Sequence, residues 1–228
     1  MREDTRAKKN FSRNLFWFQK NHEEKEISIK IMKQFEEKKF NIGKLKGISA
    51  KNIEEHLKLY AGYVKNSNLI LQKIDELAQD AEKNAYALGE IQRRFGFEYN
   101  GMRNHEVYFD SLADGLIELA SNSELKKAIE KEWGSFDFWL NRFKSIALTR
   151  GIGWAMLYYD KKDKRLLSTW VDEQHLGQLQ DCALILGLDM WEHAFVYDYQ
   201  PSGKKQYVED FFANLNWEKI EENFVNPK

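Results

Sequence analysis

The residues Asp189-Met190-Trp191-Glu192-His193-Ala194 follow an apolar run, residues 182–188, near the end of this 228-residue chain. The apolar run predicts a buried β-strand, so Asp189 comes at a strand end and His193 follows four residues later. A carboxylate buried at such a place needs a cation or a hydrogen-bond donor to offset its desolvation. Because carboxylate oxygen and imidazole nitrogen are both metal ligands, the stretch indicates part of a metal site.

The remaining histidines supply further candidate ligands. The chain has only five histidines, and His56 and His105 stand among apolar and aromatic residues in two separate helical patterns. His22 stands in a charged run and is interpreted as a surface residue. Three neutral imidazoles and one carboxylate suit iron, manganese or zinc, and a chain with one cysteine offers little thiolate.

The composition is that of a globular protein with a balanced charge. Hydrophobic residues make up 43% and charged residues 31%, and the net charge of −1 argues against a nucleic-acid partner. Cys182 has no partner for a disulfide, which predicts a reducing cytoplasmic compartment. No apolar stretch reaches the length of a membrane span, and the charged first residues do not resemble a signal peptide.

Residues 1–45 are predicted to form an N-terminal extension. Residues 1–40 carry eleven Lys or Arg against seven Asp or Glu, with one apolar cluster at residues 15–18. We expect an appendage helix or a partly ordered tail. The alternative is a docking arm whose aromatic residues pack on a partner subunit.

The first half of the chain after this extension is predicted to be helical. Ser49 can cap a helix in which Ile53, His56 and Tyr63 recur at helical spacing. A second helical run is expected over residues 69–95, followed by a third that begins near Tyr99 and carries His105. The small polar residues 121–123 mark a boundary, which places the first domain at residues 46–121.

The second half is predicted to be α+β. Helices are expected over residues 124–149 with a break near Gly134, followed by strands at residues 154–159, 166–171 and 182–188. Two closing helices are expected at residues 191–198 and 207–216. Residues 122–228 therefore form a C-terminal α/β domain with a small three-stranded antiparallel sheet.

Residues 189–194 resemble the D-x-W-E-H-A signature of the iron/manganese superoxide dismutase family. Further resemblances occur in the family's order, at residues 49–56, Y-V-x-N at 63–66, N-H at 104–105, G-S-G-W at 151–154 and N-W at 216–217. The similarity covers residues 46–225. The family fold, an α-helical hairpin domain followed by an α/β domain, agrees with the pattern above.

The resemblance implies a metal site and an activity. The implied ligands are His56, His105, Asp189 and His193, around one iron or manganese ion per subunit, and the implied activity is the disproportionation of superoxide. Gly101 stands where some members carry a side chain that takes part in the site. This favours a manganese-type or metal-tolerant member, although the sequence does not decide between the two metals.

The resemblance also implies the residues around the metal. Tyr63 would line the substrate channel and bond through a neighbouring amide or imidazole toward metal-bound solvent. His175 is preferred for that neighbour, with Gln174 in reserve. Trp154 and Trp191 would form an apolar wall around the ion.

Glu192 is implied to lie at the interface of a homodimer, or of a dimer of dimers. In the family this glutamate reaches the partner's metal-binding histidine. The alternative interpretation is a solvated helix glutamate.

Two departures from the family pattern are visible. The family separation from the first histidine to the tyrosine is usually one residue longer than the seven residues from His56 to Tyr63. Seven residues return to nearly the same face of a regular α-helix, so we expect a regular helix here with both side chains facing the metal. The second departure concerns a histidine and a tyrosine that meet across the family dimer. Leu59, or Tyr60 given the gap, and Val196 replace them, which suggests an apolar contact.

Two other functional classes remain open at this point. One is a different metalloenzyme, such as a non-haem iron oxygenase or a hydrolase, although a third histidine fills positions that such sites keep open. The other is a non-catalytic or altered-activity metal-binding homologue.

Overall fold

A computed structural model of the chain describes residues 33–227. Contacts divide the chain into two units, Met1–Gln34 and Phe35–Lys228, and every element described below belongs to the second. The apolar cluster at residues 15–18 lies outside the described residues. Among the helices of the described part, none is long and apolar enough to cross a membrane.

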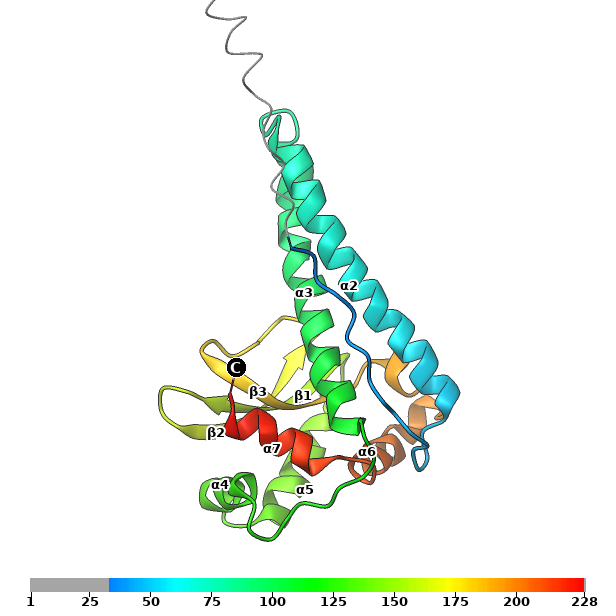
Figure 1. The fold of residues 1–228 in the computed structure, drawn as a ribbon, viewed down its shortest axis with the longest axis vertical. Coiled ribbons are helices and arrows are strands. Elements are labelled where there is room, and N and C mark those ends of the chain that lie inside the picture. The colour runs from blue at the N-terminus through cyan, green and yellow to red at the C-terminus, as the bar shows by residue number, and fades with distance from the viewer. Residues whose placement is uncertain (1–32, 228) are drawn as a thin grey trace, which may run out of the picture. The chain divides into compact units, whose positions relative to one another are not determined.

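Two long helices, α2 (Ala50–Ala78) and α3 (Ala85–Leu112), form an antiparallel hairpin (Figure 1). The hydroxyl of Ser49 accepts from the backbone N–H of Asn52 at 3.1 Å and caps α2, as predicted. The helical breaks predicted after residue 63 and after residue 95 are wrong. The buried stripe of α2 continues through Val64, Ser67 and Ile70, and the chain turns only at residues 79–84.

The C-terminal part combines helices with a small sheet. Helices α4 (Glu124–Trp133) and α5 (Phe136–Ala147) are separated where Gly134 adopts a positive φ, as predicted near that residue. The sheet has the order β2-β1-β3 with antiparallel pairing throughout, which confirms the α+β fold. Its strands are β1 (Gly153–Asp160), β2 (Arg165–Asp172) and β3 (Cys182–Asp189).

The closing segment differs from the prediction. The helix expected at residues 191–198 is a single 3-10 turn, η1 (Glu192–Ala194), followed by irregular backbone and a second such turn, η2 (Pro201–Gly203). The helix expected at residues 207–216 corresponds to α6 (Lys204–Phe212), which begins and ends earlier, and the last helix, α7 (Trp217–Val225), was not predicted. Helix α6 ends at Phe212, and a new helix begins after Asn216, whose side chain caps α7 by accepting from the N–H of Lys219.

An extended strap, residues 35–48, runs along the hairpin before α2 begins (Figure 1). The side-chain amide of Asn68 donates to the carbonyl of Phe35 and its oxygen accepts from the Phe35 N–H, at 2.9 and 2.8 Å. Further along, the ring of Phe40 packs on Tyr60 and Phe109, with centroids 5.6 and 5.3 Å apart. The strap therefore covers aromatic residues in the interior of the hairpin.

Candidate metal centre

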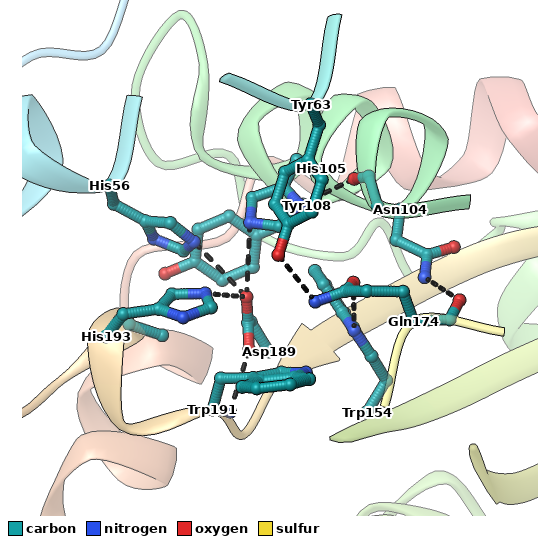
Figure 2. Close-up of polar contacts among 12 residues, drawn as sticks. His56, Tyr63, Asn104, His105, Tyr108, Trp154, Gln174, Asp189, Trp191 and His193 are labelled. Atoms are coloured by element: carbon teal, nitrogen blue, oxygen red, sulfur yellow. Dashed lines mark hydrogen bonds and ion pairs between the residues drawn. The ribbon is translucent and has the colours of Figure 1, made fainter. Parts of the chain in front are cut away.

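Four side chains from four elements converge between the hairpin and the end of β3 (Figure 2). His56 comes from α2, His105 from α3, Asp189 from the last position of β3 and His193 from η1. The Nε2 atoms of His56, His105 and His193 lie 3.2, 3.4 and 3.2 Å from Oδ2 of Asp189. All four candidate ligand atoms lie within 4.8 Å of one another.

Local hydrogen bonds fix the orientation of two of these ligands. Nδ1 of His105 lies 2.6 Å from the carbonyl oxygen of Gly101, so Nδ1 carries the proton and Nε2 presents its lone pair to the centre. Oδ1 of Asp189 accepts from the backbone N–H of Trp191 at 2.8 Å, which leaves Oδ2 facing the imidazoles. The hydroxyl of Tyr207 donates to the Asp189 carbonyl at 3.0 Å and anchors the end of β3.

Burial and mutual charge set the protonation of the group. Burial lowers the pKa of His105 to about 3, and the neighbouring His56 adds to this fall. Burial likewise lowers the pKa of His56, against the opposing effect of Asp189. Burial would raise the pKa of Asp189, but its interactions with His193 and His56 outweigh this effect and hold that pKa below its usual range. At neutral pH the group therefore holds two neutral buried imidazoles and a carboxylate, the forms that bind a cation.

The group fits a metal ion better than it fits a hydrogen-bonded cluster. Nε2 of His105 is buried and has no hydrogen-bond partner among the described residues. A buried nitrogen with a free lone pair is costly unless something coordinates it. With metal–ligand bonds near 2.1 Å, neighbouring ligand atoms stand roughly 3.0 to 3.6 Å apart, and the three distances from Asp189 Oδ2 to the imidazoles fall in this range. The donor set suits iron, manganese or zinc.

Aromatic rings surround the group on most sides. The ring of His56 packs against those of Tyr108 and Phe109, each with its centroid 4.9 Å away. Trp154 stands edge-on to His105 with ring centroids 5.1 Å apart. Trp191 stacks on His193 with centroids 5.6 Å apart. These apolar faces exclude water from the ligands, which strengthens the electrostatic interactions among them.

A hydrogen-bonded chain leads from the interior of the site to a tyrosine. The amide nitrogen of Gln174 donates to the hydroxyl of Tyr63 at 3.0 Å, and its oxygen accepts from Nε1 of Trp154 at 3.0 Å (Figure 2). Gln174 is fully buried. The preference for His175 in this role is therefore wrong. The ring of His175 instead lies against Phe97, with centroids 5.7 Å apart.

The backbone of Gln174 is held by two side chains for which the sequence predicted no such role. Its carbonyl accepts from the side-chain amides of Asn104 at 3.0 Å and Gln178 at 3.2 Å. The hydroxyl of Tyr158 in turn donates to the Gln178 side chain. Glu173, directly before Gln174, adopts a positive φ of 50°, which indicates an irregular loop. No periodic pattern signals which loop residue turns inward.

The position of the Tyr63 ring requires a glycine at position 101, because the ring fills the space that a side chain there would occupy. A Cβ added to Gly101 would lie 2.5 Å from Cδ1 of Tyr63, inside van der Waals contact. Helix α2 is a regular α-helix from His56 to Tyr63, and both side chains face the centre, as the seven-residue spacing predicts. The ring of Tyr63 lies 5.0 Å from that of His105.

The positions proposed for the dimer contact lie partly at the surface. Leu59 and Val196 are 41% and 46% exposed, and Glu192 is exposed as well. Tyr60 is buried, its hydroxyl accepting from the N–H of Lys38 and donating to Glu106. Leu59 is therefore the residue of this pair that is available to a partner.

Comparisons with known proteins agree with this geometry. Residues 121–223 match the family described as iron/manganese superoxide dismutases, C-terminal domain. An iron superoxide dismutase of Cupriavidus metallidurans is 36% identical over 185 residues, which cover 80% of this chain and 91% of that protein. An iron superoxide dismutase of Aquifex aeolicus is 34% identical, covering 79% and 85%. A manganese superoxide dismutase of Chlamydia muridarum is 32% identical, covering 75% and 83%.

The close contact between residues 101 and 63 predicts the effect of one methyl group. Gly101→Ala forces the Tyr63 ring to move, so we expect about 1–3 kcal/mol of destabilisation in urea unfolding of the metal-loaded protein. Gly89→Ala in the same helix is the matched control, because nothing lies within 4 Å of its added Cβ. It should stabilise by up to about 1 kcal/mol, the gain for replacing a helical glycine. Equal effects of the two substitutions would contradict the assigned packing.

The buried imidazoles predict how the metal-free protein responds to acid. His105 titrates at about 3 when folded but near 6.5 when unfolded, so between these values the unfolded chain binds more protons. Stability should therefore fall as the pH drops from about 6.5 toward 3, by up to about 1.4 kcal/mol per pH unit for this group. The depressed pKa of Asp189 adds a further loss below about pH 4. The free energy of unfolding, measured with urea at each pH, should change less steeply with pH in His105→Gln than in the unchanged protein. Parallel pH dependences of the two proteins would refute the assignment.

Proposed function

The chain belongs to the iron/manganese superoxide dismutase family, and we propose that it converts two superoxide ions and two protons into dioxygen and hydrogen peroxide. The observation that carries this proposal is the convergence of three imidazole Nε2 atoms on one buried carboxylate oxygen. When bound there, an iron or manganese ion supplies the one-electron redox chemistry that the reaction needs.

The protein holds the ion and keeps competing water away. His56, His105, Asp189 and His193 would bind it, and the negative charge of Asp189 favours the higher oxidation state. Trp154, edge-on to His105, and Trp191, stacked on His193, shield the ligands. The site is thus built to hold a cation in a dry cavity with one polar side.

That polar side is the pair of Gln174 and Tyr63. The Tyr63 hydroxyl can hold or release a proton, and the Gln174 amide donates a 3.0 Å hydrogen bond to it. Burial raises the pKa of Tyr63, and the charge of Asp189 adds to the rise, so its hydroxyl stays protonated at neutral pH. We infer that Tyr63 supplies and recovers protons at the open side of the site, and that Gln174 orients its hydroxyl.

We also propose a homodimer through the region of Glu192, in which each copy contributes a contact to the metal site of the other. Nδ1 of His193 makes no hydrogen bond within residues 33–227, and this side chain is 21% exposed. An exposed carboxylate such as Glu192, contributed by a second copy, suits this nitrogen. Two copies related by a twofold axis would exchange this contact reciprocally.

A cytoplasmic location is also part of the proposal. Its basis is Cys182, which is a free thiol at the start of β3. A free, partly exposed thiol suits a reducing compartment.

Metal reconstitution tests the proposed activity. Protein stripped with a chelator and reloaded with iron or manganese should consume superoxide, whereas the zinc-loaded protein should not, because zinc has no redox chemistry. Superoxide decay after pulse radiolysis and the metal content of each sample are the measurements. Asp189→Asn should lower the metal affinity by more than about 100-fold. Fully iron- or manganese-loaded protein without activity would refute the function.

Substitution of Glu192 tests the proposed dimer. We expect Glu192→Ala to shift the protein toward monomer in sedimentation velocity, because His193 then loses its partner across the interface. Glu218→Ala is the control, since this residue is also exposed but lies on α7. A monomeric unchanged protein, or equal dissociation by both variants, would count against the assignment.

A further inference from the structure

The ligand group is open to solvent on one side. The side chains of His56, His105 and Asp189 are 0% exposed, whereas that of His193 is 21% exposed. Beside His193, Tyr63 and Trp191 are also partly exposed. The partly exposed Tyr63 and Trp191 define the mouth of the site, whereas the exposed part of His193 is the part that the proposed dimer contact would cover.

Phe97 lies at this mouth. Its ring centroid is 6.1 Å from that of Tyr63 and 6.3 Å from that of Trp191. Phe97 thus bridges the two residues that flank the opening, one from α2 and one from the segment after β3. An exposed charged group stacked on Phe97 therefore stands next to the path of a small molecule into the site.

Arg94 occupies that position. Its guanidinium carbon lies 3.7 Å from the ring centroid of Phe97, a cation stacked on an aromatic face. The same guanidinium forms an ion pair with Glu98, through Nη2 at 2.7 Å and Nε at 2.8 Å from Oε1. Sequence reasoning missed this pair, because an arginine and a glutamate four residues apart are common on any exposed helix.

The pair is unequally exposed. The side chain of Arg94 is 54% exposed and that of Glu98 only 6%, so solvent meets the positive end of the pair. Glu98 also accepts from the side-chain amide of Asn66 at 3.4 Å, which further occupies the carboxylate. An anion approaching from solvent meets the guanidinium before it meets the carboxylate.

We propose that Arg94 is an anion-capture residue, which attracts small monovalent anions, superoxide among them, to the mouth formed by Phe97, Tyr63 and Trp191. This inference rests on the proposed function for the identity of the substrate. An exposed cation beside the opening raises the local concentration of an anionic substrate and hence its rate of association.

The charge of Arg94 reaches the residues of the site. Burial and the charges of Asp189 and Glu98 raise the pKa of Tyr63, and the charge of Arg94 opposes this rise. Arg94 and Glu98 therefore act on Tyr63 with opposite sign. The same opposition should hold for an anion that arrives beside Tyr63.

This opposition of sign separates anion capture from a structural role. If the pair only stabilises the helix, removing either partner should weaken the site in the same direction. If Arg94 captures anions, Arg94→Gln leaves an unbalanced carboxylate and should slow association, whereas Glu98→Gln leaves an unpaired cation and should speed it. Arg93→Gln is the matched control, because Arg93 is the adjacent arginine, 76% exposed and paired with Glu90.

The experiment measures two quantities on each iron-loaded variant. One is the second-order rate constant for superoxide decay at ionic strengths of about 10 mM and 500 mM, where the screening length falls from roughly 30 Å to below 10 Å. The other is the dissociation constant of azide, a small monovalent anion, from an optical titration of the metal centre. At low ionic strength we expect both association rate and azide affinity to fall about two- to fourfold in Arg94→Gln, to rise similarly in Glu98→Gln and to stay unchanged in Arg93→Gln. The differences should shrink at high ionic strength.

Two results would overturn the inference. One is a fall in azide affinity with both Arg94→Gln and Glu98→Gln, and the other is an equal fall with Arg94→Gln and Arg93→Gln. The azide titration does not require turnover, so it also distinguishes the two proposals. A protein inert toward superoxide whose azide affinity follows the expected order refutes the function but retains the anion-capture site.

Discussion

A carboxylate with no exposed surface is the constraint on which this structure depends. Asp189 is fully buried at the end of β3, and a lone charge in such a place would cost several kcal/mol. Three imidazoles and one backbone N–H surround the carboxylate, and a cation bound by this group would offset the remaining cost. Because the imidazoles arrive from three other elements, the hairpin, the sheet and the turn after β3 must meet at one point.

The hairpin and the strap hold two of the histidine ligands in place around the buried carboxylate. Helices α2 and α3 each carry one histidine, and the antiparallel pairing of the hairpin brings His56 and His105 to the same level. The strap at residues 35–48 packs Phe40 against Phe109, whose ring in turn backs His56. A segment remote from the site thereby limits the movement of a ligand, because packed aromatic rings leave little free volume.

The four ligands were predictable from the sequence because they lie in regular or motif-bearing segments. The apolar run of β3 predicted that Asp189 is buried, and the helical spacing predicted that His56 and Tyr63 share one face of α2. The choice between Gln174 and His175 was not predictable in the same way. Adjacent residues in an irregular loop point in directions that only the backbone conformation decides, and Glu173 before them has a positive φ. The long helices were divided wrongly because polar residues on their exposed faces look like breaks.

The separation of the ligands along the chain has a thermodynamic consequence. His56 and Asp189 are 133 residues apart, so an ion held by both acts as a cross-link that closes a very long loop. The entropy of closing a loop rises only slowly with its length, so bringing these distant ligands together costs little more than closing a short loop would. Free metal concentration then sets the folding equilibrium directly, because only the folded chain presents the assembled ligands. In a metal-starved cell this protein would be less persistent as well as less active.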